Sequence, residues 1–237
     1  MRTLTKLLAA TALAAGMAVS ASAHANVVSI QVKLDNVLYN LSSTGTYTQG
    51  ANFANFFGSI GTFNLNLLGG SINDVPLLQT NANVQGVDSV SHKLEIFITG
   101  QGYTLPIGPA AAYTSTFQTS VLSSGWTIDE TTWISPTNQV PPSLSYVGTT
   151  LATAHMDPSL IAGTTAVTGY DPGAGPYSIS AQYTIITGVG SQGNGAANSV
   201  VNVLNAVPEP ATWALMIMGF GGVGALARNR RRQASFA

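Results

Sequence analysis

Strict alternation of apolar and polar residues over short segments is the feature that most limits the fold of this chain. Four segments show it, with the apolar members Val28, Ile30, Val32 and Leu34; Phe63, Leu65 and Leu67; Leu94, Ile96 and Ile98; and Tyr177, Ile179, Ala181, Tyr183 and Ile185. A period of two is typical of strands with one buried and one solvated face. The sequence therefore predicts a mainly β protein.

Turn-forming residues separate these segments and set the expected architecture. Breakers lie at 69–70, 100–102, 141–142, 171–173 and 188–195. Further strands are expected at 113–122, 125–133, 143–147 and 200–204, with a short helical turn near 53–57. Many short strands joined by turns are typical of an antiparallel β-sandwich or jelly roll.

The charges are distributed unevenly along the chain. Residues 26–206 hold only two basic side chains, Lys33 and Lys93, against eight acidic ones. Nucleic-acid binding requires clustered lysine and arginine, so this composition argues against it. The chain also has no cysteine, which means that an exported domain must rely on its own core rather than on disulfides.

The N-terminal residues 1–25 resemble a cleavable signal peptide. Arg2 and Lys6 precede an uncharged apolar stretch that is too short to favour a membrane span. Small residues at alternate positions then offer two cleavage sites, after Ala23 and after Ala25. We expect a signal helix that is removed on export, leaving residues 26–206 as the exported domain.

Few residues of this domain point to catalysis or to metal binding. Asp129, Glu130 and Asp157 could supply the two carboxylates of a glycosidase. His155 with Asp157, or the loop 171–175, could hold a metal ion, but surface turns explain both better. The nucleophile motif G-x-S-x-G is absent, since Gly58-Ser59-Ile60-Gly61 lacks its first glycine. The sequence thus predicts no catalytic residue, no metal site and no cofactor.

Threonines suggest two surface features. Thr44, Thr46 and Thr48 would form one row if 44–48 were a strand, and such rows can meet ice or carbohydrate, although an exposed sheet edge is the simpler interpretation. The pattern G-T-T-x-x-T occurs at 148–153 and again at 163–168. Two copies are fewer than a solenoid needs, so coincidence explains them better.

The C-terminal segment 207–237 has the composition of a membrane anchor. Residues 211–227 carry no charge and would span about 26 Å as a helix, just short of a typical bilayer core. Arg228 and the arginines at 230–232 follow directly, which places this end in the cytoplasm and residues 26–206 outside. A buried soluble helix with a charged end is the alternative.

The same segment also resembles a known sorting signal. The elements are Pro208-Glu209-Pro210, then Trp213-Ala214, then a glycine-rich stretch with Gly219, Gly221 and Gly222, then Arg230, Arg231 and Arg232. In this order and spacing they are similar to the PEP-CTERM signal in its PEPxxWA form, a tail also labelled the ice-binding protein C-terminal domain. The resemblance implies an exosortase partner, a membrane peptidase or transpeptidase of Gram-negative bacteria that make exopolysaccharide.

These observations define the expected function. We expect an exported protein that is anchored transiently in the inner membrane, sorted by an exosortase, and then used without enzymatic activity at the cell surface or in a biofilm matrix, where exopolysaccharide is a further candidate partner. A carbohydrate- or ice-binding surface protein and a polysaccharide-active hydrolase are the alternatives. The sequence identifies no family for residues 26–206.

Overall fold

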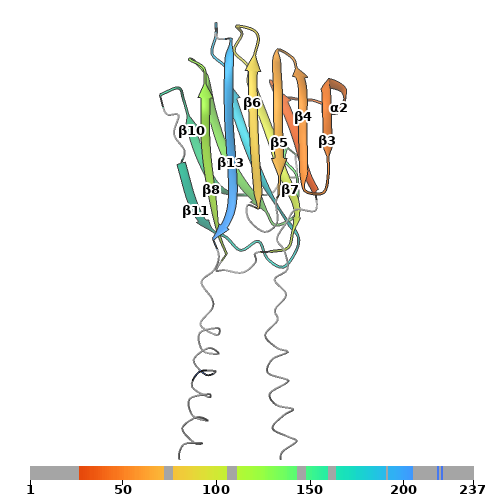
Figure 1. Cartoon of the computed structure of the whole chain (residues 1–237), viewed down its shortest axis with the longest axis vertical. Coiled ribbons are helices and arrows are strands. Elements are labelled where there is room, and N and C mark those ends of the chain that lie inside the picture. The colour runs from red at the N-terminus through yellow and green to blue at the C-terminus, as the bar shows by residue number, and fades with distance from the viewer. Residues whose placement is uncertain are drawn as a thin grey trace, which may run out of the picture.

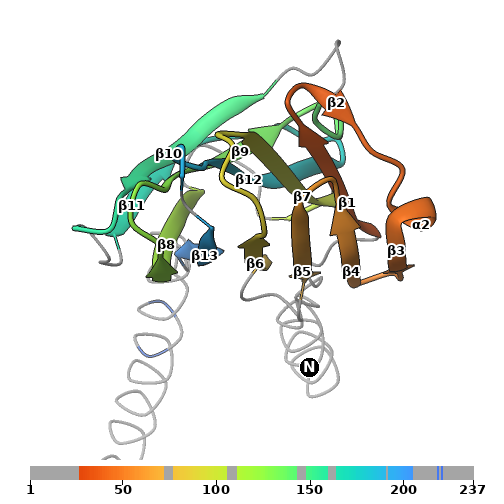
Figure 2. The same cartoon turned by 90° about the horizontal axis from the view of Figure 1, so that it is seen from above.

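The computed structural model describes residues 27–71, 77–105, 111–142, 148–159, 164–190 and 192–204, together with residues 218 and 220. These residues form two antiparallel sheets packed face to face, which confirms a mainly β, sandwich-like fold (Figures 1 and 2). The signal peptide, the strand expected at 143–147 and nearly all of the 211–227 segment lie outside the described residues. Among the described residues, no helix combines the length and the apolar character that crossing a bilayer requires.

The six-stranded sheet has the order β10-β9-β12-β7-β1-β2. Its strands are β1 (Val27–Leu34), β2 (Val37–Leu38), β7 (Lys93–Tyr103), β9 (Thr127–Ser135), β10 (Thr149–Met156) and β12 (Tyr177–Ile186). Three of the four segments that alternate in the sequence form strands of this sheet: β1, β7 and β12. Each pairing in the sheet is antiparallel.

The seven-stranded sheet has the order β11-β8-β13-β6-β5-β4-β3 (Figure 1). Its strands are β3 (Gly45–Gln49), β4 (Phe53–Ile60), β5 (Phe63–Gly70), β6 (Leu78–Gly86), β8 (Ala112–Leu122), β11 (Thr164–Gly169) and β13 (Gly193–Leu204). A single turn of helix, α2 (Leu41–Thr44), precedes β3 and is capped by the Asn40 side chain, which accepts from the amide of Ser42.

The core lies between the sheets and is rich in aromatic residues. Its largest fully buried side chains include Trp126, Tyr103, Tyr113, Tyr177, Tyr183, Phe56, Phe63 and Phe117. Tyr103 and Tyr177 stack with their ring centres 5.5 Å apart. Trp126 packs closely against β6, because a Cβ atom on Gly86 would come within 2.8 Å of the indole ring. This position therefore requires glycine.

Several sequence expectations about local structure were wrong, and the breakers expected at 69–70 and 100–102 lie within strands β5 and β7. Residues 53–57 begin strand β4 instead of forming a helical turn. Phe56 points into the core and its neighbour Phe57 points out, so the adjacent phenylalanines hid the alternation. The breaker expected over 188–195 ends early, because β13 already starts at Gly193 and pairs with β6. Pairing to a neighbouring strand overrides the weak strand propensity of glycine there.

The expected solvated faces of β7 and β12 were also wrong. Phe97 and Thr99 on β7, and Ser178 and Ser180 on β12, point away from the core but are buried. These two strands lie in the middle of the six-stranded sheet, where neighbouring side chains cover them. The hydroxyls are hydrogen-bonded, since Thr99 and Ser180 pair across the strands at 2.9 Å and Ser178 donates to the carbonyl of Gln139 at 2.6 Å.

The threonine features resolve into sheet edges. Thr44 ends α2 and so does not continue the row, which leaves Thr46 and Thr48 on β3 at the edge of the seven-stranded sheet. The two G-T-T segments enter β10 and β11, which are edge strands of opposite sheets. Thr168 on β11 donates to the carbonyl of Leu151 on β10, so this contact links the two sheets along one side.

Candidate functional site

The outer surface of the seven-stranded sheet is lined by side-chain amides. We call this surface the amide face and define it by the outward residues Asn55, Phe57, Ser59, Asn64, Asn66, Gln79, Asn81, Asn83, Gln85, Gln118, Asn194, Ala196 and Asn198. The core residues between them on each strand point inward, so the pleat sorts amides to one side and apolar residues to the other.

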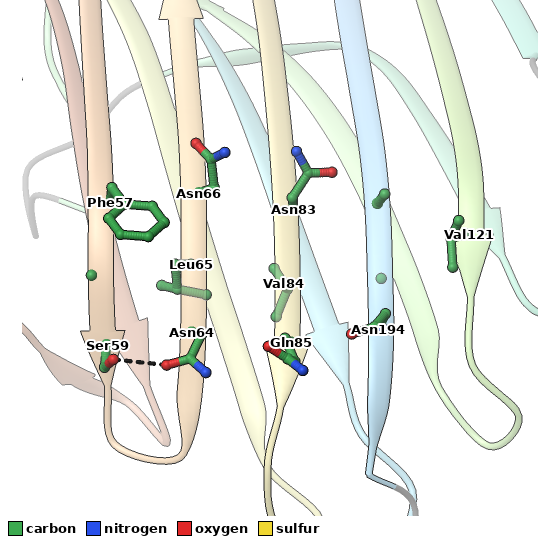
Figure 3. A pocket seen from close by; sticks show the side chains of 13 residues that line it. Phe57, Ser59, Asn64, Leu65, Asn66, Asn83, Val84, Gln85, Val121 and Asn194 are labelled. Carbon is green, nitrogen blue, oxygen red and sulfur yellow. Dashed lines mark hydrogen bonds between the residues drawn. The ribbon is translucent and has the colours of Figure 1, made fainter.

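Pairing across the strands arranges these amides in rows. Phe57, Asn66, Asn83 and Ala196 are successive neighbours from β4 to β13, and Val121 on β8 ends the row. A second row of Ser59, Asn64, Gln85 and Asn194 runs beside the first (Figure 3). Ser59 donates to the Asn64 side chain at 2.8 Å, which fixes that amide in place.

A hollow of about 430 Å³ lies over these two rows. Phe57 borders it on β4 and Val121 borders it on β8 (Figure 3). The small residues Gly195 and Ala196 line it from β13, which lies between these strands. We call this the first hollow. The Phe57 side chain is 70% exposed, an unusual state for a large aromatic residue. The combination of a hollow, an exposed ring and neighbouring amides is typical of a ligand-binding surface.

The amide face has no charge. None of the seven strands of this sheet contains an aspartate, glutamate, lysine, arginine or histidine. Asparagine and glutamine each offer two donors and a carbonyl acceptor, so the face can exchange hydrogen bonds with hydroxyl groups in either direction. Binding to the amide face therefore involves no acidic, basic or histidine side chain of this sheet.

The charged groups gather on the six-stranded sheet and its connections. Glu95 on β7 accepts Lys33 at 3.4 Å and Lys93 at 3.1 Å, so both lysines of residues 26–206 meet one carboxylate. His92 lies between Asp35 at 2.7 Å and Asp88 at 3.2 Å. The hydrogen bond to Asp35 raises the pKa of His92 although partial burial opposes it.

The predicted carboxylate candidates do not converge. Asp129 and Glu130 are adjacent on β9 and therefore point to opposite faces of the sheet. Asp129 lies on the exposed side, 2.6 Å from His155, and that hydrogen bond raises the pKa of the histidine. Asp157 accepts from the amide of Ser159 in a turn. None of the three lines the first hollow.

Glu130 is buried between the sheets. Its Oε1 atom accepts a long 3.4 Å hydrogen bond from Thr119, and its Oε2 atom has no hydrogen-bond partner among the described residues. Burial raises the pKa of Glu130 to about 8. The side chain is thus largely protonated at neutral pH, in a place that solvent does not reach.

The other expected sites are local turns or lie in the tail. Asp171 accepts from the amide of Gly173, closing the turn that was considered for calcium. Among the described residues, no group of three histidine or carboxylate side chains is placed to hold a metal ion. The cleavage residues Ala23 and Ala25 and the sorting residues at 208–214, 219–222 and 230–232 lie outside the described residues, except that Phe220 is helical.

The patterns considered above predicted none of the residues of the amide face as a site. A signal was nevertheless present: Asn64 and Asn66 alternate with Leu65 and Leu67, and Asn81, Asn83 and Gln85 alternate with Ala82 and Val84. Amides at every second position of two strands indicate an outward face built from amides. That the two strands are neighbours became visible only in the fold.

Comparison with solved structures finds distant likeness only. A carbohydrate-binding module, TmCBM61, in complex with β-1,4-galactotriose matches with 9% identity and a TM-score of 0.30, over 59% of this chain and 81% of the other. The adhesin domain of Epf from Streptococcus pyogenes matches with 10% identity and a TM-score of 0.38, over 75% and 58% of the two chains. At these scores the likeness carries no functional inference.

Comparison by sequence identifies the tail. No curated protein matches the chain. A family model does match its C-terminal end, and the match confirms the sorting signal that the ordered Pro-Glu-Pro, Trp-Ala, glycine and arginine elements predicted. The match supports an exported protein whose sorting takes place at the membrane. Residues 206–232 carry the PEP-CTERM protein-sorting motif.

Proposed function

We propose that this protein is a non-catalytic component of the cell surface or extracellular matrix that binds a neutral polysaccharide through the amide face. The observation that carries the proposal is the uncharged first hollow, where an exposed phenylalanine stands beside rows of amides. The sorting motif supports a location where such polymers occur.

The chemistry of the first hollow matches the chemistry of a sugar. A sugar ring presents hydroxyls around its rim and C–H groups on its faces. Asn66, Asn83 and Gln85 can donate to and accept from the hydroxyls, and the Phe57 ring can pack against the C–H face. Each amide contributes only about 1 kcal/mol of net binding energy, so we expect modest affinity that accumulates along a polymer.

The rival classes have less support. A hydrolase needs two carboxylates facing one substrate, and the first hollow is lined by none. An ice binder would be favoured by a flat rank of threonine rows. The amide face instead has amides and a hollow at its centre, and its threonines lie toward the edges, as with Thr46 and Thr48 on β3.

The position of the first hollow suits a tethered protein. Ala196 lies eight residues before the end of β13 at Leu204, which is about 26 Å along the strand. The sorting motif begins directly after this strand, at residue 206. The first hollow therefore lies toward the end of the sandwich away from the tail attachment.

The decisive experiment is a binding assay with Phe57→Ala. The full-length chain, produced without an exosortase and kept in detergent, would be assayed against galactan, mannan and mixed-linkage glucan, with polygalacturonate as an anionic comparison. We expect binding to at least one neutral polymer, weakened about tenfold in Phe57→Ala, because covering one ring face contributes roughly 1.5 kcal/mol.

The matched control is Leu38→Ala, which removes another exposed apolar side chain from β2 on the other sheet. Its binding should equal that of the parent. The proposal is wrong if the parent binds none of the neutral polymers, or if Phe57→Ala binds them as tightly as Leu38→Ala does.

Sorting by an exosortase is tested separately. Replacing Pro208, Glu209 and Pro210 together by alanine should leave export intact but hold the protein in the membrane fraction, since the extended segment offered to the enzyme would be lost. An antibody against residues 26–206 would follow both forms through fractionation. Identical distribution of variant and parent in cells that contain an exosortase would leave the tail as an anchor only.

A further inference from the structure

A second hollow lies on the same face as the first. It measures about 260 Å³ and is lined by Asn52, Phe53, Leu68, Gly69, Gly70, Gln79, Thr80 and Asn81. Phe53 is 45% exposed and its ring lies over Gly50, while Leu68 is 52% exposed. The second hollow thus repeats the composition of the first, with an exposed phenylalanine of β4 beside amides of β6.

The two hollows are adjacent along the strands. Strands β4, β5 and β6 supply residues to both. Asn66 lines the first hollow and Leu68, the next outward residue of β5, lines the second. On β6, Asn83 of the first hollow donates to Asn81 of the second at 2.8 Å. No charged side chain separates them, because these strands contain none.

The spacing exceeds the reach of a single sugar. Phe57 and Phe53 are four positions apart on β4, about 13 Å along the strand. Gln85 and Gln79 are six positions apart on β6, about 20 Å. A ligand that contacts both phenylalanines must therefore be an extended chain of several units.

We propose that the two hollows are subsites of one track that binds a linear, neutral polysaccharide lying along β5 and β6. This inference rests on the proposed function and adds the shape of its ligand. Phe57 and Phe53 flank the track from β4 as two stacking positions, and the amides of β5 and β6 lie beside them on the neighbouring strands. Occupying the second subsite after the first adds affinity without a second loss of translational freedom.

The test is a length series. Size-fractionated fragments of galactan, mannan and mixed-linkage glucan, from disaccharide to octasaccharide, would be titrated into the full-length chain by calorimetry. We expect the octasaccharide to bind at least about tenfold more tightly than the trisaccharide for the polymer that binds. Phe53→Ala should reduce this length dependence by weakening the octasaccharide more than the trisaccharide, and Phe57→Ala should weaken both.

The outcomes separate the two proposals. Long chains also bind more tightly for statistical reasons, so the Phe53→Ala variant carries the decision, with Gln79→Ala as a second variant of the second hollow. If affinity is independent of length, or if neither variant changes it, the track is wrong while a single glycan site at the first hollow remains. If no fragment of any of the three polymers binds, both proposals fail.

Discussion

Both sheets of this sandwich are antiparallel, yet their outer faces differ completely in charge. In the described strands, the aspartate, glutamate, lysine and histidine side chains all belong to the six-stranded sheet: Lys33, Lys93, Glu95, Asp129 and His155 on its outer side, and Glu130 on its inner side. The seven-stranded sheet has none. One face neutralises its charges internally, and the other avoids them.

This difference changes how open each face is. On the six-stranded sheet, polar side chains bind one another: Glu95 pairs with two lysines, and Thr99 is hydrogen-bonded to Ser180. On the seven-stranded sheet, the amides keep the surface wettable without charge, and the exposed Phe57 and Phe53 remain uncovered. Each amide offers more donors and acceptors than the Ser59–Asn64 and Asn83–Asn81 hydrogen bonds use, so a ligand can still bind to these side chains.

The largest effect should come from Glu130, which lies between the two sheets. Its pKa rises from 4.5 to about 8 on burial, so the folded state keeps a proton that the unfolded chain releases above pH 4.5. Stability should therefore fall as pH rises from about 4.5 to 8, by an amount on the order of a few kcal/mol. Glu130→Gln should remove this fall and be more stable than the parent at pH 8, as measured by urea unfolding.

The direction in which stability changes with pH tests this assignment. Thr131→Ala, a neighbouring half-buried position, serves as the control and should keep the pH dependence of the parent. The stability of the parent and that of Glu130→Gln would be compared between pH 5 and pH 8. If both change with pH in the same direction and by the same amount, the carboxyl group is not held in its neutral form.

The next effect tests the neutrality of the amide face directly. Asn66→Asp with Asn83→Asp places like charges on neighbouring strands and replaces donors by acceptors. We expect glycan affinity to fall at least about tenfold at pH 7 and to recover as pH drops below the aspartate pKa, near 4. The parent should show no such dependence, because the strands of its seven-stranded sheet contain no aspartate, glutamate or histidine.

Thr150→Asp with Thr153→Asp on β10 is the matched control, since it adds two charges at exposed positions of the other sheet. Its affinity should stay at the parent value across the same pH range. Equal loss in the control and in the amide-face variant would mean that net charge, and not the chemistry of the amide face, governs binding.

A smaller effect is expected from His92, which joins the turn after β1 to the connection before β7. Its hydrogen bond to Asp35 raises the pKa of the histidine. This stabilisation is complete below the unfolded pKa, near 6.5, and is lost as pH rises through the raised value. His92→Gln should cost up to about 1 kcal/mol at pH 6 and less at pH 8, by thermal unfolding of both forms. A cost that grows with pH would contradict this assignment.

The smallest effect should come from Lys33→Met. Lys33 is partly exposed although Glu95 is buried, and Lys93 remains to accompany the carboxylate. We expect a loss of about 0.5 kcal/mol or less, reduced further in high salt, and no change in glycan binding. A large loss would mean that the charged cluster stabilises the six-stranded sheet far more than its exposure suggests.

The sequence by itself determined the strands whose alternation is complete, the near absence of charge, and the sorting motif. β1 and β5 follow from local patterning because each has one face against the core. The motif at 206–232 is readable because its elements are consecutive in the chain. Such features depend on neighbours in sequence, and a sequence displays them directly.

Only the tertiary structure decided which strands are neighbours. β7 and β12 are covered on both sides because they lie in the middle of a sheet, a position that their own residues do not specify. The first hollow takes Phe57 from β4, Asn83 from β6, Val121 from β8 and Ala196 from β13. These residues come together through backbone hydrogen bonds between distant strands. Any strand offers the same donors and acceptors to a partner, so the choice of partner depends on how the whole core packs.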